Sequence, residues 1–162
     1  MDYIFQTKVF NHSEKKKSFI DIIDLIPNTP IKNSNDDIFH SDYYLSHETH
    51  KNYFSLLSDI IQPHLKKMMD SLKVNKCQIS SYWFQRYKNN GTHGWHTHEG
   101  SNYANVYFLE CPKGYSTKFK HFTKDCEEGD ILSFPAFLPH MSPKIEDDSV
   151  KTIISFNTEF LM

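Results

Sequence analysis

The chain has 162 residues, of which 38% are hydrophobic, 23% charged and 15% aromatic. This length is usual for one domain, and the many aromatic residues exclude disorder for most of the chain. The formal net charge of −2 gives no electrostatic footprint for nucleic acid or an anionic membrane. We therefore expect a single domain that binds neither, and we interpret the lysine run 15–17 as a solvated turn.

The three cysteines, Cys77, Cys111 and Cys126, are odd in number and form no CxxC motif. This argues against a disulfide framework or a zinc ribbon and favours reduced thiols. No apolar run approaches the ~18 residues of a membrane span, and an acidic residue follows Met1 where a secretory signal is positive. We expect a soluble, cytoplasmic protein.

The N-terminal part predicts one strand and two helices. Residues 1–10 alternate weakly, as a strand does, and residues 18–26 predict a short amphipathic helix that is followed by a loop over 28–37. Apolar residues recur every three or four positions over 46–72, which predicts a long helix. Pro63 lies inside that stretch, so we expect a kink or a break there.

After residue 75 the sequence changes to short runs of β-branched and aromatic residues that are separated by Gly, Pro and Asn. Several short strands at this spacing favour a sandwich or a barrel. The long helix is needed to cover a sheet, so residues 1–75 and 76–158 are expected to form one domain. The predicted strands lie near 76–87, 94–98, 102–110, 116–121, 130–134 and 150–158.

Histidine is the most informative residue type. His96 and His98 are two positions apart, so in a strand their side chains share one face and could hold a metal ion. His140 follows a predicted strand that ends in a proline turn, and it is the best candidate for a third ligand. Strand alternation points Glu99 away from the pair. A lone HxH pattern is more often a pair of surface or cross-strand histidines, and that alternative stays open here.

Several motifs in order resemble one family. The stretch 87–98 resembles the first metal motif of Fe(II)- and 2-oxoglutarate-dependent oxygenases, most closely the prolyl-4-hydroxylase-like branch found in tailed phages and marine bacteria. Residues 129–140 of this chain resemble the family's segment that bears the last metal ligand, and residues 151–157 resemble the family's final cofactor strand. Residues 105–110 and 114–119 resemble the strands between these motifs. The resemblance covers about residues 76–158.

The resemblance implies a mainly β fold, a double-stranded β-helix or jelly roll, with the N-terminal helical part packed on the sheet. His96 matches the first histidine ligand of Fe(II), and His140 matches the last. His98 stands where many members have an aspartate. A face of three histidines still binds Fe(II) and leaves three positions open.

The resemblance also places the co-substrate 2-oxoglutarate. Lys151 stands where the family has the arginine that binds the distal carboxylate, and Tyr87 stands where a tyrosine often donates to the same group. Arg86 is the only arginine of the chain and could contact substrate or form a structural salt bridge. Ile153 replaces a serine of the family, and Phe108 falls where some relatives have a tyrosine.

The resemblance therefore implies a dioxygenase that uses 2-oxoglutarate and O2 to hydroxylate an unidentified substrate, with a protein side chain suggested by analogy. One alternative is a cupin-like metalloprotein with three histidines and no 2-oxoglutarate. Asn102 and Tyr103 stand where a cupin motif has a glutamate, which counts against it. A second alternative is a non-catalytic phage-type structural module. A homo-oligomer stays open. The other histidines, among them His12 and His40, are expected at the surface, with His64 partly buried in helix packing.

Overall fold

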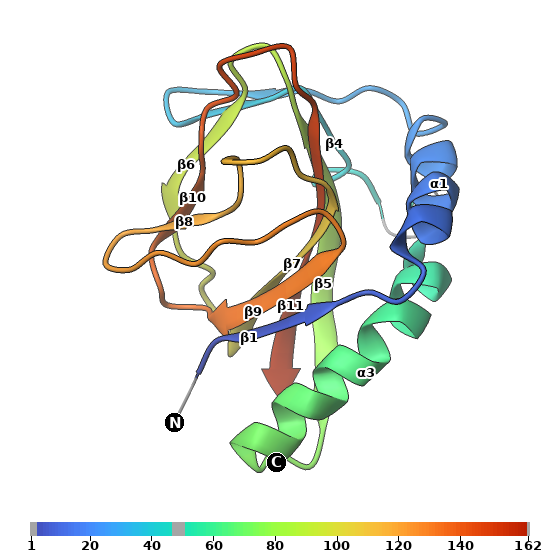
Figure 1. The fold of residues 1–162 in the computed structure, drawn as a ribbon, viewed down its shortest axis with the longest axis vertical. Coiled ribbons are helices and arrows are strands. Elements are labelled where there is room, and N and C mark those ends of the chain that lie inside the picture. The colour runs from blue at the N-terminus through green and yellow to red at the C-terminus, as the bar shows by residue number, and fades with distance from the viewer. Residues whose placement is uncertain (1–2, 47–50, 162) are drawn as a thin grey trace.

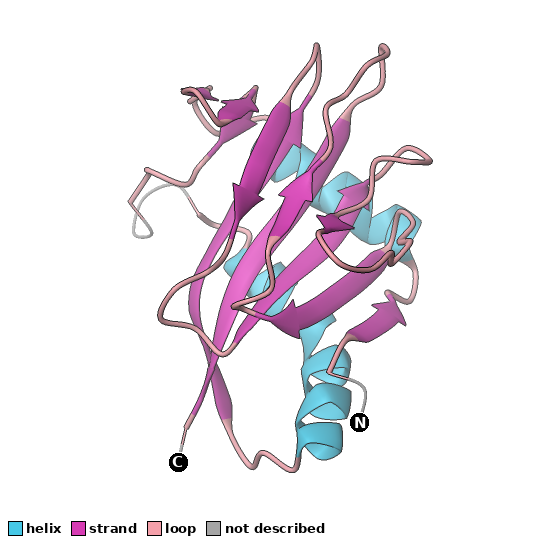
Figure 2. Cartoon of the chain, turned by 90° about the vertical axis from the view of Figure 1, so that its left-hand side faces the viewer, coloured by secondary structure: helices cyan, strands magenta, loops and turns pink. Residues whose placement is uncertain are grey.

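The computed structural model describes residues 3–46 and 51–161. Its strands form two antiparallel sheets, which is the jelly roll that the sequence predicts. The six-stranded sheet has the order β1-β9-β7-β11-β5-β4, and the five-stranded sheet has the order β2-β3-β6-β10-β8. Both helices lie on one side of the six-stranded sheet, while β6, β8 and β10 lie on the other (Figure 1). The strands stand in front of the helices in Figure 2.

Two helices and eleven strands are described in this part of the chain. The helices are α1 (His12–Ile23) and α3 (Phe54–Leu72). The strands are β1 (Phe5–Lys8), β2 (Ile31–Lys32), β3 (Asp36–Ile38), β4 (His40–Ser41), β5 (Cys77–Tyr87), β6 (Thr92–His96), β7 (Tyr103–Glu110), β8 (Lys118–Phe119), β9 (Asp130–Pro135), β10 (His140–Ser142) and β11 (Lys151–Phe160).

The first helix begins earlier than the sequence predicts. It starts at His12, so the lysine run 15–17 lies inside α1 and not in a turn. Lys16 Nζ donates to Glu128 Oε1 at 2.8 Å. This ion pair ties α1 to the turn before β9, a contact between distant parts of the chain that local periodicity does not reveal.

The predicted loop 28–37 contains two short strands, which corrects that interpretation. β2 and β3 form a hairpin in which the side-chain oxygen of Asn33 accepts the backbone N–H groups of Asn35 at 2.8 Å and Asp36 at 2.9 Å. β3 in turn pairs with β6. Polar residues that look like loop breakers therefore close a tight turn and bring Asp36 beside the candidate site.

The second helix continues through Pro63, so the predicted break does not occur. The helix begins at Phe54, later than the predicted range 46–72. Residues 51–53 are not helical, and residues 47–50 lie outside the described residues. Leu57, Ile61 and Met68 are buried along one face. Their packing stabilises the helix although Pro63 cannot donate a backbone hydrogen bond.

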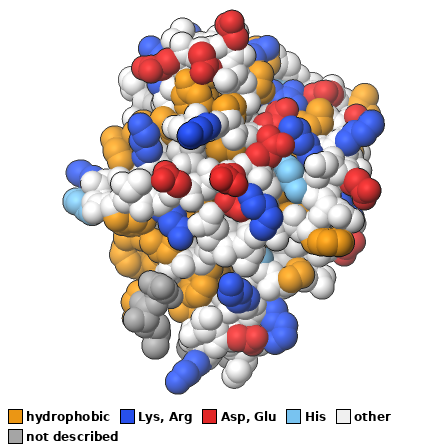
Figure 3. All heavy atoms as spheres, in the orientation of Figure 1, with side chains coloured by type: hydrophobic (Ala, Val, Ile, Leu, Met, Phe, Trp, Pro, Cys, Tyr) orange, Lys and Arg blue, Asp and Glu red, His pale blue; other side chains and the backbone are white. Residues whose placement is uncertain are grey.

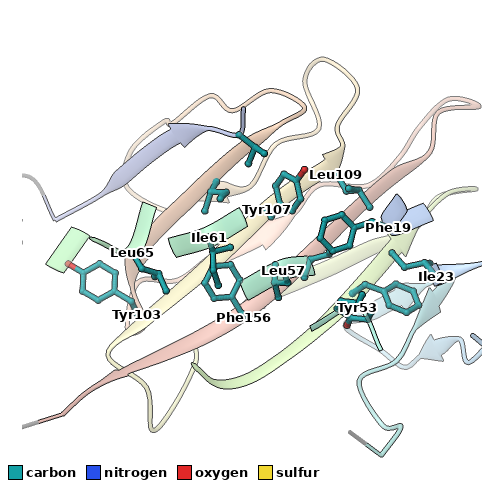
Figure 4. Close-up of a cluster of buried hydrophobic side chains, with 14 of the residues drawn as sticks. Phe19, Ile23, Tyr53, Leu57, Ile61, Leu65, Tyr103, Tyr107, Leu109 and Phe156 are labelled. Carbon is teal, nitrogen blue, oxygen red and sulfur yellow. The ribbon is translucent and has the colours of Figure 1, made fainter. Parts of the chain in front are cut away.

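The six-stranded sheet is covered on both faces. On the helix side, Phe19 of α1 and Leu57 and Ile61 of α3 pack on Tyr107 and Phe156 of the sheet (Figure 4). A second cluster, including Phe108, Leu132 and Phe134, fills the space between the two sheets. Cover on both faces explains why the residues of β7 and β11 are buried almost without alternation.

The surface carries charges of both signs. On the face seen in Figure 3, Lys and Arg side chains are interspersed with Asp and Glu, in keeping with the small formal charge. Within the described ranges, no helix has the length and apolar character needed to cross a membrane.

Candidate metal centre

Three histidines converge between the sheets. His96 ends β6 and is the cross-strand partner of His140, the first residue of β10. His98 lies two residues beyond β6, where its backbone N–H donates to Ala136 O at 2.9 Å. The potential ligand atoms of the three imidazoles all lie within 4.8 Å of one another. The predicted strand 94–98 is thus wrong at its end, because an anchored loop, not strand alternation, positions His98.

Each of the three imidazoles has its Nδ1 bonded to an oxygen. His96 Nδ1 lies 2.7 Å from Gly94 O, and His140 Nδ1 lies 2.9 Å from Leu138 O. His98 Nδ1 lies 2.6 Å from Asn157 Oδ1. Carbonyl oxygens only accept, so each Nδ1 carries the hydrogen and each Nε2 keeps a free lone pair. Histidines that bind a metal commonly donate the hydrogen of their other ring nitrogen to an oxygen in this way.

Burial keeps these imidazoles neutral. It lowers the pKa of His140 to about 3, with the neighbouring His96 as the next cause. Burial also lowers the pKa of His96 and of His98. Neutral imidazole is the form that binds a metal, so the three residues present a metal with unprotonated ligands at neutral pH. Three imidazoles suit iron, zinc, copper or nickel.

His93 stacks on this cluster from the side. Its ring lies 3.7 Å from the ring of His96, centroid to centroid, at an angle of 14°. Its Nε2 lies 3.6 Å from Asp36 Oδ1. His93 is thus in contact with His96, whereas Trp95 is 48% exposed.

Lys151 and Tyr87 meet at the other end of the site. They are cross-strand partners on β11 and β5, and both are fully buried. Lys151 Nζ donates to Ser142 Oγ at 2.7 Å, and the Tyr87 hydroxyl donates to Gln85 Oε1 at 2.8 Å. Burial lowers the pKa of Lys151 to about 8 and raises that of Tyr87.

Two spaces join at the histidines. An inner chamber of about 20 Å³ extends from the histidine cluster to Tyr87 and Ser142, and Ile153 lines it. An outer pocket of about 740 Å³ opens to solvent between aromatic side chains that include Tyr43. Trp83 lines both spaces. A metal held by the histidines would therefore border both the small inner chamber and the larger outer pocket.

Some residues of the site escape the sequence analysis. Asn157, which bonds His98, lies on the same strand as Lys151, six positions further on. Ser142, which accepts from Lys151, lies two positions after His140. Strand parity was the available signal for both, since residues two positions apart share a face. The same signal applies to Gln85, which lies two positions before Tyr87 on β5.

Two histidines that were expected at the surface are covered by the rest of the fold. His12 is partly buried, with Nδ1 2.7 Å from the hydroxyl of Tyr107, and His40 is 5% exposed. His64 was expected to be partly buried and is 2% exposed, with its Nδ1 2.7 Å from Thr7 Oγ1.

The sole arginine forms a structural ion pair. Arg86 Nη1 lies 2.8 Å from Oδ1 of Asp24, the residue that follows α1.

A jelly roll that encloses three convergent imidazoles between its sheets defines a candidate metalloprotein of the cupin type. The family comparison agrees with this class. The cupin family model matches residues 68–159, more than half of the chain, and the chain belongs to the cupin family. Among curated proteins, none matches this sequence.

Solved structures share the fold at low sequence identity. The viral collagen prolyl hydroxylase vCPH of Paramecium Bursaria Chlorella virus-1, in complex with 2-oxoglutarate, is 16% identical with a TM-score of 0.67, covering 99% of this chain and 97% of its own. A 2OG-Fe(II) oxygenase family oxidoreductase of Burkholderia pseudomallei is 11% identical with a TM-score of 0.74, covering 97% and 85%. HygX of Streptomyces hygroscopicus, with nickel and 2-oxoglutarate bound, is 10% identical with a TM-score of 0.66, covering 99% and 84%.

Proposed function

We propose that this protein is an Fe(II)- and 2-oxoglutarate-dependent dioxygenase that hydroxylates a C–H bond of a substrate still to be identified. One observation carries the proposal: a single chamber is lined by the histidine cluster and by Tyr87 and Ser142, and a buried lysine donates to Ser142 from behind that lining. His96, His98 and His140 stand at one end of the chamber. Tyr87 and Ser142 stand at the other, where Lys151 donates to Ser142.

The three histidines fit an iron ion. Their Nε2 atoms are free, their Nδ1 atoms are bonded, and three ligands leave three positions of an octahedron open. His98 takes the place of the usual carboxylate, so the site is one negative charge short of the common facial triad. When bound, iron and 2-oxoglutarate supply the oxidising chemistry, in which O2 is consumed, 2-oxoglutarate becomes succinate and CO2, and the substrate C–H becomes C–OH.

The opposite end of the chamber fits the distal carboxylate of 2-oxoglutarate. His140 and Ser142 are two residues apart on β10, about 6–7 Å along a strand, which suits a five-carbon dicarboxylate. Lys151 would supply the positive charge and Tyr87 a hydroxyl donor, once that hydroxyl leaves Gln85 Oε1. Ile153 offers no hydrogen bond where the family has a serine, so Lys151, Ser142 and Tyr87 carry the anion.

The fold comparison supports this assignment, since vCPH holds 2-oxoglutarate and HygX holds nickel and 2-oxoglutarate on the same architecture. For the primary substrate we propose a protein side chain. The outer pocket is wide enough for one, and its aromatic wall of Tyr43, Tyr44 and Trp83 offers apolar contact area beside the metal. The structural neighbour vCPH is a collagen prolyl hydroxylase, which supports the same class.

The alternative is a cupin-like metalloprotein that binds metal at three histidines without 2-oxoglutarate. The donor set favours it, because His98 replaces the carboxylate, and so does the match to the cupin family. Lys151 distinguishes the two functions. In this alternative Lys151 only supports packing, and its replacement leaves ligand binding at the metal unchanged.

The test is an anaerobic titration of the purified protein with Fe(II) and then 2-oxoglutarate, followed by visible absorption. We expect a weak charge-transfer band that is lost in His140→Ala and weakened in Lys151→Met. Lys118→Met, which alters an exposed lysine on β8, is the matched control and should keep the band. Iron binding without a band would contradict the proposal and favour the three-histidine alternative. A failure to bind iron would contradict both.

A further inference from the structure

The indole N–H of Trp83 is the one buried side-chain nitrogen or oxygen atom without a hydrogen-bond partner in residues 3–46 and 51–161. The side chain is only 6% exposed. An unpaired buried donor destabilises a folded protein, and native structures contain few of them. Such a donor therefore indicates an acceptor that arrives with a bound molecule.

Trp83 lies at the metal end of the site. Its ring packs on His98 at 5.8 Å between centroids, with 33° between the planes, and it meets Tyr43 edge-on at 5.2 Å. Tyr87 lies four residues further along β5, about 13 Å at the rise of a strand. Tyr87 thus marks the far end of the chamber, and Trp83 marks the end at which the histidines would hold a metal.

Two spaces could bring that acceptor to Trp83. The ring lines both the outer pocket and the inner chamber, and its nitrogen is out of reach of solvent. The chamber has room for about one water, so a larger ligand must move the side chains that it shares with the pocket, among them Trp83 and Gln85.

We infer that the Trp83 indole N–H donates a hydrogen bond to the metal-side carboxylate of 2-oxoglutarate. The inference rests on the proposed function and adds a binding residue to it. The three metal ligands are all histidines, so the protein places no carboxylate at the metal end of the chamber. The anion received at that end would therefore be 2-oxoglutarate. Lys151 would hold one carboxylate, and Trp83 would orient the other.

The test compares Trp83→Phe with Trp95→Phe. Both remove an indole N–H and keep an aromatic ring, but Trp95 is 48% exposed. Binding of 2-oxoglutarate to Mn(II)-loaded protein is measured by calorimetry, together with Mn(II) affinity and the unfolding midpoint of the unliganded protein. We expect Trp83→Phe to bind 2-oxoglutarate roughly tenfold or more weakly, as loss of a hydrogen bond to a charged group implies. Its Mn(II) affinity should be unchanged. Its unfolding midpoint should fall only by what the smaller ring accounts for, because the free protein loses no hydrogen bond.

Each contrary result has its own meaning. If Trp83→Phe binds 2-oxoglutarate like the wild type while Lys151→Met does not, this inference is wrong and the proposed function stands. If Trp83→Phe loses Mn(II) to the same extent, Trp83 acts by packing on His98 and the inference is also wrong. If the wild type binds no 2-oxoglutarate, the proposed function fails and the inference fails with it.

A second measurement does not use the Trp83→Phe variant. In Trp95→Phe, Trp83 is the only remaining tryptophan. Its emission should shift when 2-oxoglutarate is added to the Mn(II)-loaded protein, and succinate, which lacks the keto group and chelates poorly, should give a smaller shift. An emission spectrum that 2-oxoglutarate leaves unchanged would overturn the inference.

Discussion

Lys151 and Tyr87 face each other across β11 and β5, with Lys151 Nζ 5.4 Å from the centre of the Tyr87 ring. Both side chains are fully buried, and the ammonium donates to the hydroxyl of Ser142. A buried cation without a carboxylate is costly, so a site of this kind is suited to receive an anion from outside.

The affinity for 2-oxoglutarate should depend on pH through Lys151. Burial lowers the pKa of Lys151 to about 8, so the ammonium is present below pH 8 and lost as the pH rises above it. We expect the affinity to be highest below pH 8 and to fall by about tenfold per pH unit above it, as linkage to one proton requires. Calorimetric titrations of Mn(II)-loaded protein between pH 6.5 and 9.5 would measure this. In Lys151→Arg, which stays charged throughout, the profile should be flat. A flat profile in the wild type would contradict the assignment.

Metal affinity should depend on Asn157. Its side-chain oxygen accepts from His98 Nδ1 at 2.6 Å, and its amide donates to Ser81 Oγ at 3.0 Å. Loss of such an outer partner costs 10–100-fold in metal affinity in general, and we expect a loss of about that size in Asn157→Leu. Asn157→Asp keeps an acceptor and should bind Co(II) at least as tightly as the wild type.

Competition with a chelator, read from the Co(II) absorption spectrum, would measure these affinities. Ser81→Ala removes only the support of Asn157 and should give a smaller loss. Equal affinities in Asn157→Leu and the wild type would show that His98 needs no partner to bind metal.

The only arginine should matter for stability and not for the site. Arg86 Nη1 pairs with Asp24 at 2.8 Å, and its Nε donates to Thr152 at 3.2 Å. The partner carboxylate is 55% exposed, so Arg86→Met should lower the free energy of unfolding by about 1 kcal/mol or less. Urea denaturation would measure that change. The affinity for 2-oxoglutarate should stay within about twofold of the wild type, and a loss as large as that of Lys151→Met would place Arg86 in the site.

The stability of the fold should fall in acid because of His64. This histidine is 2% exposed, with Nδ1 2.7 Å from Thr7 Oγ1 and Nε2 2.6 Å from Ser133 Oγ, and burial lowers its pKa to about 4. A lowered pKa in the folded state means that the unfolded chain binds the proton more tightly. The contribution is therefore complete above pH 6.5 and is lost as the pH falls toward 4, by about 3 kcal/mol in total.

Urea denaturation of the wild type and His64→Gln at pH 7 and pH 4 would test this. The loss of stability between the two pH values should be smaller in the variant by about the same 3 kcal/mol. The exposed His121→Gln controls for the substitution itself. An equal loss in the wild type and His64→Gln would assign the acid sensitivity to other groups.

The strand pattern of the sequence determined a sandwich or barrel and most of its strands, and the family resemblance narrowed this to a jelly roll. β5, β7, β9 and β11 lie within a few residues of the predicted ranges, because short apolar runs between turn residues are a local signal. The three histidines that converge were also named from the sequence. Their recognition depended on residue type and on the order of motifs, and both can be read along the chain.

Other features were decided only by the tertiary structure. Asn157 bonds His98 across 59 positions, Arg86 meets α1, and His64 reaches Ser133 across 69 positions. Local periodicity cannot reveal these partners, because they depend on which strands pair and in which register. The buried state of Lys151 depends on the same register, which sets it opposite Tyr87 and within reach of Ser142. The sequence thus supplied the chemical groups, and the packing of two sheets and two helices decided their neighbours, their burial and hence their protonation.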